Sequence, residues 1–320
     1  MPSTSNVVST FPIQILNLLC PVKCFEAIRQ IRWPNGVECV KCGSLEIKKN
    51  GKHNSQPERQ KYECTCGCHF DDLTGTIFEG RHQPITVWIL AIYFMGLNVS
   101  NSQIAKELDL NISDAHNMAT AIRESVLDKK PDPVLKNSVE ADEVYIVAGH
   151  KGHPDAVEAL GREGRRNRLR GAPGRGTLAK EKPPVLGIVE RGGDVALFML
   201  PNVQIETIEP ILRSRIELGS LVYTDEYAIY GRLPAWGYQH KTVCHAKGEY
   251  ARDEDGDGHF EVHVNTIEGF WSLLRSWLRP HRGISQENLP HYLGFFEFTH
   301  NVRRRGKRLL PALLGLLLSP

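Results

Sequence analysis

The spacing of apolar residues along the chain changes near residue 130. Ahead of that point, outside a polar and turn-rich stretch, apolar residues recur every three or four positions, as on one face of a helix. A short pattern of this kind lies within residues 1–35, and three longer ones follow: "ITVWILAIYFMGL", "SNSQIAKELDL" and "NISDAHNMATAIRESVL". Ser113 is a plausible N-cap for the last of them. Three helices separated by tight polar turns predict a helix-turn-helix region over residues 84–128.

Beyond the proline-rich linker "KKPDPVLKN", the pattern alternates between strands and helices. "SVEADEVYIVAG" predicts a strand, and "PPVLGIVERGGDVALFML" predicts a hairpin with Gly192 and Gly193 at its turn. "IETIEPILRSRI" is typical of a helix, and "GSLVYTDEYAIY" of a buried strand that enters a helix. Strands followed by crossover helices predict an α/β sheet that contains parallel pairs.

The polar stretch holds two close groups of cysteines: Cys39 and Cys42, then Cys64, Cys66 and Cys68. Zinc takes four thiolates in a tetrahedron, and two knuckles on adjacent hairpins supply them. The first group has the usual Cys-x-x-Cys spacing, whereas Cys-x-Cys-x-Cys leaves the second pair ambiguous. We favour Cys64 and Cys66, because a Cys-Gly pair then ends both knuckles, with Cys68 as the substitute. The stretch thus predicts a zinc ribbon over residues 36–72; reduced bystander cysteines are the alternative.

The net charge of +2 conceals strong segregation. Residues 162–182 contain eight basic and two acidic side chains, and five of the six residues from 303 to 308 are basic. Such blocks favour a polyanionic partner, with a solvated loop as the alternative. The insert 162–182 is rich in Gly and Arg, so it could become ordered on phosphates. The candidate DNA contacts are Arg165, Arg166, Arg168, Arg170, Arg175, Arg303, Arg304 and Arg305.

Three carboxylates beyond the proline-rich linker stand in unusual places. Asp142 lies within an apolar strand, and Asp225 lies where a strand meets a helix. Burying a carboxylate is costly unless it is paired or binds a metal, although a satisfied structural Asp is the common case. Glu268 lies beside the apolar face of a helix, and Arg275 follows two turns later on the same stripe. Such a trio could hold two Mg²⁺ ions for phosphoryl transfer, with Arg275 near DNA phosphate.

Seven motifs together resemble the zinc-ribbon DDE insertion-sequence transposases. The resemblance runs from about residue 25 to about residue 305. The motifs read "RWPNGVECVKCGS", "LTGTIFEG", "VEADEVYI", "GHKGHP", "LVYTDEY", "HVNTIEGFWSLLR" and "GISQENLPHYLGFFEFTHN". The resemblance implies an RNase H-like catalytic domain that uses Asp142, Asp225 and Glu268 with Mg²⁺. It also implies strand cleavage at transposon ends, followed by attack of the freed 3′-OH on target DNA. Arg275 occupies the family's basic position. Some members carry Asn at the third acidic position, so Asn265 is a further candidate near the metals.

The expected fold class is therefore a multi-domain α/β protein. A zinc ribbon and a helix-turn-helix precede an RNase H-like mixed β-sheet domain that helices flank. The expected segments are a helical leader 1–35, the ribbon 36–72, the helix-turn-helix 84–128, the catalytic domain 136–308 with its insert 162–182, and an apolar tail 309–320.

The expected partners are double-stranded DNA, as transposon ends and target, and further copies of the chain in a homodimer or higher oligomer. No apolar segment is long enough to span a membrane, and no signal-peptide pattern is present. We therefore expect a prokaryotic cytoplasmic protein associated with the nucleoid. The alternatives are a catalytically silent DNA-binding regulator derived from a transposase, and an RNase H-like nuclease without strand transfer. "DEDGDG" resembles the start of a calcium loop, but Val264 falls where the last ligand belongs, which favours a solvated loop.

Overall fold

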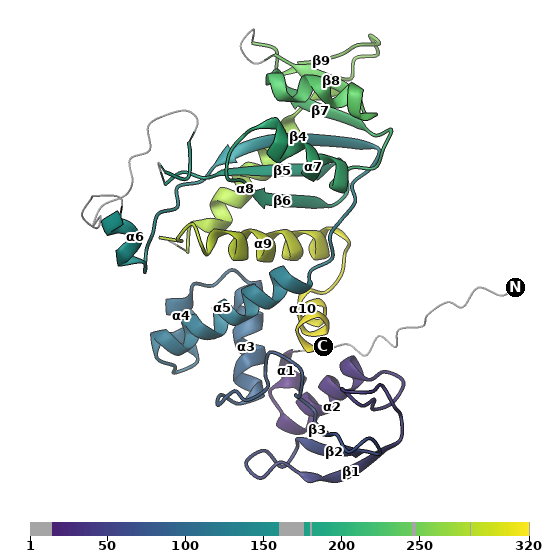
Figure 1. The fold of residues 1–320 in the computed structure, drawn as a ribbon, viewed down its shortest axis with the longest axis vertical. Coiled ribbons are helices and arrows are strands. Elements are labelled where there is room, and N and C mark those ends of the chain that lie inside the picture. The colour runs from purple at the N-terminus through teal and green to yellow at the C-terminus, as the bar shows by residue number, and fades with distance from the viewer. Residues whose placement is uncertain (1–14, 160–175, 180, 245–247, 282, 320) are drawn as a thin grey trace, which may run out of the picture. The chain divides into compact units, whose positions relative to one another are not determined.

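The computed structural model describes residues 15–159, 176–179, 181–244, 248–281 and 283–319 (Figure 1). The chain forms two compact units. The first comprises residues 1–125 and 308–320, and the second comprises residues 126–307. The division falls inside a helix, a few residues before the proline-rich linker, and the apolar tail belongs to the first unit. Among the described helices, none has the length and the apolar character that crossing a bilayer requires.

Four helices of the first unit pack around one another. They are α1 (Ile15–Leu18), α2 (Pro21–Arg32), α3 (Ile85–Gly96) and α10 (Leu309–Leu318), and α10 packs against α2 and α3. Gly96 permits a close approach of α10, because a Cβ at that position would lie 3.0 Å from the Leu309 side chain. The apolar tail is thus an integral part of this helical core.

Two further helices carry side-chain caps at their N-termini: α4 (Asn101–Glu107) and α5 (Ile112–Lys129). The Ser100 hydroxyl accepts the backbone N–H of Gln103 at 3.3 Å. In α5 the cap is Asn111, whose Oδ1 accepts the backbone N–H of Asp114 at 2.8 Å. The expected Ser113 cap is wrong, because Ser113 already lies inside the helix, and its hydroxyl donates to Asn111.

A three-stranded antiparallel sheet separates α2 from α3 in sequence. Its order is β1-β2-β3, with β1 at Ile47–Lys52, β2 at Gln60–Cys64 and β3 at His69–Asp71. Asp72, fully buried, joins this sheet to α2. Its carboxylate accepts from Nε and Nη2 of Arg29 at 3.0 and 3.1 Å and from the backbone N–H of Gln60 at 2.7 Å. The Tyr62 hydroxyl donates a further bond of 3.1 Å.

The second unit is built on a five-stranded mixed sheet. The strand order is β6-β5-β4-β7-β8; β4, β5 and β6 are antiparallel neighbours, whereas β7 and β8 run parallel to β4. The expected hairpin and the expected parallel pairs are confirmed, and Gly192 at the hairpin turn has a φ of +77°. The strands are β4 (Ser138–Tyr145), β5 (Pro184–Glu190), β6 (Val195–Met199), β7 (Leu221–Asp225) and β8 (Gln239–Val243).

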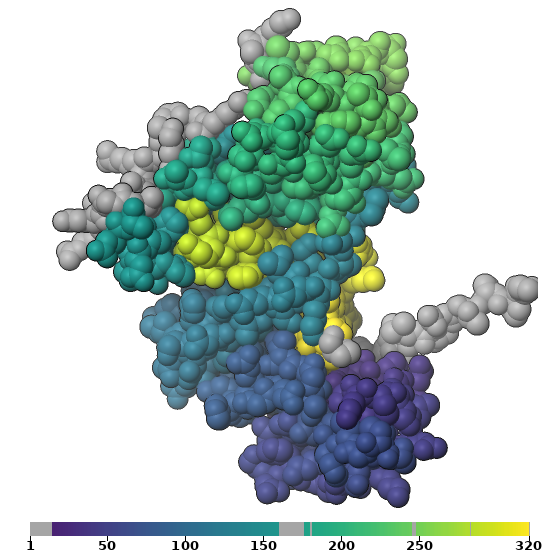
Figure 2. Space-filling model, in the orientation of Figure 1, coloured from purple at the N-terminus to yellow at the C-terminus, as the bar shows by residue number. Residues whose placement is uncertain are grey.

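Helices cover both faces of this sheet (Figure 1). One face packs against α7 (Ile205–Arg215) and the 3₁₀ helix η1 (Ala228–Trp236) through a core that includes Ile188, Ile208 and Leu233. In Figure 2, α7, η1 and the neighbouring strands belong to one continuous green surface. The other face packs against α8 (Asn265–Leu278) and α9 (Leu289–Arg304). The unit also contains α6 (Pro154–Ala159) and the antiparallel pair β9 (Ala251–Arg252) and β10 (Val262–His263).

Side chains of α9 occupy the free edge of β6. Asn301 Oδ1 accepts the backbone N–H of Val195 at 2.9 Å, and Asn301 Nδ2 donates to the carbonyl of Val195 at 2.9 Å. Four residues earlier, Glu297 Oε2 accepts the backbone N–H of Leu197 at 2.9 Å. Lys130 neutralises Glu297 at 2.6 Å. An open strand edge invites pairing with other chains, so these bonds close the sheet at this end.

Candidate metal and catalytic sites

Four cysteines of the first unit form a compact group. The Sγ atoms of Cys39 and Cys66 lie 3.7 Å apart, those of Cys42 and Cys64 lie 3.6 Å apart, and all four lie within 4.8 Å of one another. A zinc ion with four sulfurs at about 2.3 Å sets the sulfurs about 3.8 Å apart. The group therefore fits zinc in both donor type and spacing.

The turns that shape the two knuckles depend on glycine. Gly43 and Gly67 have φ values of +72° and +79°, which L side chains rarely adopt. The N–H of each donates to the carbonyl of the first cysteine of its knuckle at 2.9 Å. Cys68 lies outside the group of four. Its backbone carbonyl accepts from the Cys64 N–H at 3.0 Å.

The three candidate acids come from neighbouring elements of the second unit. Asp142 lies in β4, Asp225 ends the parallel neighbour β7, and Glu268 lies exposed in the first turn of α8. Burial raises the pKa of Asp142 to about 6. Hydrogen bonds from Trp271 and from the backbone of Glu143 oppose this shift, whereas the charges of Asp225 and Glu268 add to it. The fold thus brings Asp225 and Glu268 close enough for their charges to act on Asp142.

This arrangement is looser than the cysteine group. Within the part of the chain that the structure describes, the three carboxylates are not among the groups whose ligand atoms all lie within 4.8 Å. Two metal ions in a phosphoryl-transfer site stand about 3.5–4 Å apart. Carboxylates that bind different ions therefore do not have to lie within 4.8 Å of one another. Oxygen donors whose mutual repulsion a cation would relieve fit Mg²⁺ by their chemistry.

Trp271 of α8 holds Asp142 directly. Its Nε1 donates to Asp142 Oδ2 at 2.9 Å. The indole lies over Gly187 of β5, which is paired with Asp142, and a Cβ at Gly187 would stand 2.3 Å from the ring. The spacing of apolar residues places Trp271 on the apolar face of its helix and predicts no bond to a carboxylate. The one available signal was chemical, because a buried indole N–H usually needs an acceptor.

Neighbouring backbone and aromatic groups fix the other end of the site. The backbone N–H of Tyr227 donates to Asp225 Oδ1 at 3.0 Å, which orients the carboxylate at the strand end. The hydroxyl of Tyr230 donates to Glu143 Oε1. Tyr230 is fully buried; burial and the charge of Glu143 raise its pKa well above the usual value, so it is a hydroxyl donor at neutral pH. Sequence reasoning missed this pair.

Asn265 and Arg275 lie on the exposed side of α8, one at its first residue and the other two turns beyond Glu268. The backbone N–H of Asn265 donates to His263 Nδ1 at 3.2 Å. Burial and the charge of Arg191 lower the pKa of His263, partly offset by Glu140, which suits a neutral ring that accepts this bond. Asn265 is therefore the first residue of α8 and lies on the same face of the helix as Glu268.

The predicted DNA-contact residues divide into two groups. Arg303 and Arg304 are exposed at the end of α9, whereas Arg305 forms an ion pair with Asp194 and is already partly neutralised. The remaining candidates, Arg165, Arg166, Arg168, Arg170 and Arg175, lie outside the described residues.

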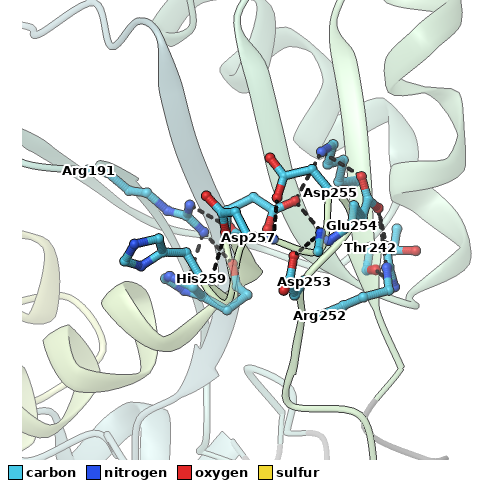
Figure 3. A network of polar contacts seen from close by, with 12 residues as sticks. Arg191, Thr242, Arg252, Asp253, Glu254, Asp255, Asp257 and His259 are labelled. Atoms are coloured by element: carbon cyan, nitrogen blue, oxygen red, sulfur yellow. Dashed lines mark hydrogen bonds and ion pairs between the residues drawn. The ribbon is translucent and has the colours of Figure 1, made fainter.

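The acidic "DEDGDG" loop is organised by its own backbone (Figure 3). Asp253 accepts the N–H groups of Gly256 and Gly258 at 2.7 and 2.9 Å, and these bonds lower its pKa. Lys241 pairs with Glu254 at 2.6 Å and lies 3.7 Å from Glu261. Backbone donors and a lysine thus serve several of these carboxylates. Ligand atoms of Asp253, Asp255 and Glu261 nevertheless all lie within 4.8 Å of one another, so the loop keeps the spacing of a candidate cation site.

Comparison with known proteins identifies the class to which this chain belongs. The chain matches the ISXO2-like transposase domain over residues 134–301. It is 33% identical over 308 residues to a protein in transposable element ISH50 of Halobacterium salinarum, which covers 92% of this chain and 99% of that protein. It is 29% identical over 107 residues to a transposase-like protein of Haemophilus influenzae, covering 33% of this chain and 80% of that protein. The chain therefore belongs to the insertion-sequence DDE transposase family.

Among solved structures, the chain is similar to one from a simian T-cell lymphotropic virus intasome in complex with the PP2A regulatory subunit B56 gamma. The identity is 10%, and the match covers 64% of this chain and 66% of that one. The TM-score of 0.27 is too low to indicate a shared fold.

Proposed function

We propose that this protein is an active DNA transposase that binds the terminal inverted repeats of its element and catalyses Mg²⁺-dependent strand cleavage and strand transfer. The observation that carries the proposal is the placement of the three acids on adjoining elements, β4, β7 and α8, where the charges of Asp225 and Glu268 both act on Asp142. Family membership supports it, because three carboxylates near one end of a mixed sheet are the catalytic equipment that the resemblance implies. The strand order and the helices on both faces also support an RNase H-like architecture.

In this proposal the side chains of the protein hold the metal ions and the DNA in place. Asp142, Asp225 and Glu268 would hold two Mg²⁺ ions, with Asn265 beside them. When bound, such ions stabilise the attacking and leaving oxygens of an in-line phosphoryl displacement. Trp271 keeps the Asp142 carboxylate oriented, and the exposed Arg275 would contact a DNA phosphate close to the reacting strand.

The first unit would recognise the transposon ends. Its four-cysteine group would hold a structural zinc ion, with Cys39, Cys42, Cys64 and Cys66 as ligands. The helices α3, α4 and α5 would form the helix-turn-helix region over residues 84–128. Arg303, Arg304 and the arginines of the insert would add phosphate contacts, whose strength should fall with salt. Two ends must be joined in one complex, so we also propose a dimer or higher oligomer on DNA in the prokaryotic nucleoid.

Labelled transposon-end DNA incubated with the protein, unlabelled target DNA and Mg²⁺ tests the proposal. Joined products are the expected result. Asp142→Ala should abolish cleavage and leave end binding nearly unchanged, because the carboxylate serves the chemistry and not the recognition. A variant that still cleaves would refute the assignment of the site.

The same experiment separates the two alternatives. Binding without cleavage would indicate a silent DNA-binding regulator derived from a transposase. Cleavage without joining would indicate an RNase H-like nuclease that lacks strand transfer.

A further inference from the structure

Glu140 places a fully buried carboxylate on β4. It lies two residues before Asp142, so both side chains point to the same face of the sheet, and its side chain is 0% exposed. A carboxylate is stable in such a position only when it is paired and hydrogen-bonded. The partners of Glu140 come from α8 and from the hairpin turn after β5. Through these partners, Glu140 is linked to residues close in sequence to each of the three candidate acids.

The first partner is the start of α8. The backbone N–H of Ile267 donates to Glu140 Oε2 at 2.9 Å. Ile267 is the third residue of the helix, and the first N–H groups of a helix have no acceptor within it. Val264, at the N-cap position, makes no side-chain cap bond. Glu140 therefore caps α8 from a strand, where the helix dipole favours a negative charge. The residue after Ile267 is Glu268.

The second partner is Arg191, whose guanidinium joins Glu140 to the segment that leads into α8. Its Nε donates to Glu140 Oε1 at 2.7 Å. Its Nη1 donates to the carbonyl of Glu261 at 2.8 Å, and its Nη2 donates to the carbonyl of His263 at 2.7 Å. Figure 3 shows Arg191 reaching toward this segment. The planar, fork-shaped guanidinium suits such a junction of several acceptors.

The same cation also reaches β7. The guanidinium carbon of Arg191 lies 3.9 Å from the centre of the Tyr223 ring, a cation–π distance. Tyr223 is the partner of Glu140 across β4 and β7, and it lies two residues before Asp225. The Glu140–Arg191 pair thus contacts positions near all three acids. Glu140 lies two residues before Asp142 and accepts from Ile267, the residue directly before Glu268. Arg191 packs on Tyr223, two residues before Asp225.

We propose that Glu140 and Arg191 form a positioning pair, which sets the distances between Asp142, Asp225 and Glu268 and thereby the affinity of the site for divalent cations. The inference rests on the proposed function, because the pair acts only through those three carboxylates. A buried ion pair often contributes no net stability relative to apolar residues of the same volume. Positioning and stability can therefore be separated by experiment.

The first variant is Glu140→Gln, which keeps the shape of the side chain and removes its charge. Cleavage of labelled end DNA is measured against Mg²⁺ concentration, and Mn²⁺ binding to the DNA-free protein is measured by electron paramagnetic resonance. The Mg²⁺ concentration for half-maximal cleavage should rise about 10-fold or more, and Mn²⁺ affinity should fall in parallel, as when the supports of metal ligands are removed. The KM for end DNA should not change. Unaltered Mn²⁺ affinity would overturn the proposal.

Glu297→Gln is the matched control. Glu297 is 1% exposed and pairs with Lys130, yet it serves the edge of β6 rather than the carboxylates. This variant should lower the melting temperature without changing Mn²⁺ affinity. If it weakened Mn²⁺ binding as much as Glu140→Gln does, the effect would be general destabilisation and the positioning role would be refuted.

The double variant Glu140→Leu/Arg191→Met replaces the pair with apolar side chains of similar volume. We expect a melting temperature near that of the wild type together with weakened Mn²⁺ binding. Wild-type Mn²⁺ binding in the folded double variant would refute the proposal; if this variant fails to fold, Glu140→Gln decides. A wild-type protein that binds Mn²⁺ but does not cleave DNA would refute the proposed function, and the Mn²⁺ comparison would still test the pair.

Discussion

The indole Nε1 of Trp271 donates a 2.9 Å hydrogen bond to Oδ2 of Asp142, across 129 residues of sequence. Together with the bond from Ile267 to Glu140, it docks α8 on β4 at two points. The two helix residues are four apart and the two strand residues are two apart, so each pair shares one face of its element. The helix that carries Glu268 is thus registered against the strand that carries Asp142.

Replacing Trp271 tests this relationship. Trp271→Phe keeps an aromatic ring over Gly187 and removes the N–H donor, so Asp142 loses a bond that favours its charged form. The pKa of Asp142 should rise further, and cleavage at pH 7 should fall about 10- to 100-fold, the usual effect of losing a support of a metal ligand. Trp277→Phe, on the same helix among aromatic rings, should cleave normally. Equal activity of the two variants would show that the indole bond is not needed.

The raised pKa of Asp142 predicts a pH-dependent cost to stability in metal-free protein. Its folded pKa of about 6 exceeds the usual pKa of 3.8, so the folded state holds the extra proton between these pH values. The free energy of unfolding should therefore fall as pH rises from about 4 to about 6, by up to about 3 kcal/mol, since one pKa unit corresponds to about 1.4 kcal/mol.

Asp142→Asn isolates this effect. In urea denaturation with EDTA, the variant should be more stable than the wild type above pH 6, and the difference should shrink toward pH 4. Mg²⁺ should stabilise the wild type and not the variant. A difference that does not vary with pH would show that Asp142 titrates normally.

The cysteine group predicts one zinc ion per chain and identifies its ligands. Cys66→Ser should lose most of the bound zinc, as measured by plasma mass spectrometry of the purified protein, because a tetrahedral site then lacks a thiolate. Cys68→Ser is the matched control and should keep its zinc, because Cys68 lies outside the group of four. The reverse pattern would make Cys68 the fourth ligand.

The edge of β6 predicts a stability defect that spares metal binding. Asn301→Ala removes both side-chain bonds to Val195 and leaves buried backbone groups without these partners. Thermal or urea unfolding should show a loss of about 2–4 kcal/mol, since an unsatisfied buried group costs about 1–3 kcal/mol. His300→Ala is the comparison, because His300 is the preceding residue on α9 and does not make these bonds to the strand. Equal losses in both variants would assign the effect to packing alone.

Most elements could be predicted from local pattern. Alternating or helical spacing located the hairpin around Gly192, the strand that contains Asp142 and the helix that begins at Asn265. The cysteine spacing predicted a group of four, and the Cys-Gly pair that ends each knuckle favoured Cys66 over Cys68, as the structure has it. Local rules failed at the cap of α5, where Asn111 takes the place of Ser113, because the helix begins two residues earlier than the pattern indicated.

The sequence by itself determined which residue types are available: thiolates at knuckle spacing, three acids on separate elements, and an apolar stripe on α8. Only the tertiary structure decided how they meet. Glu140 reaches Arg191 and Ile267 at separations of 51 and 127 residues, because β4 lies between β5 and β7 and beneath α8. Such contacts depend on the order of strands in the sheet and on which face a helix covers, and neither leaves a periodic trace in the chain.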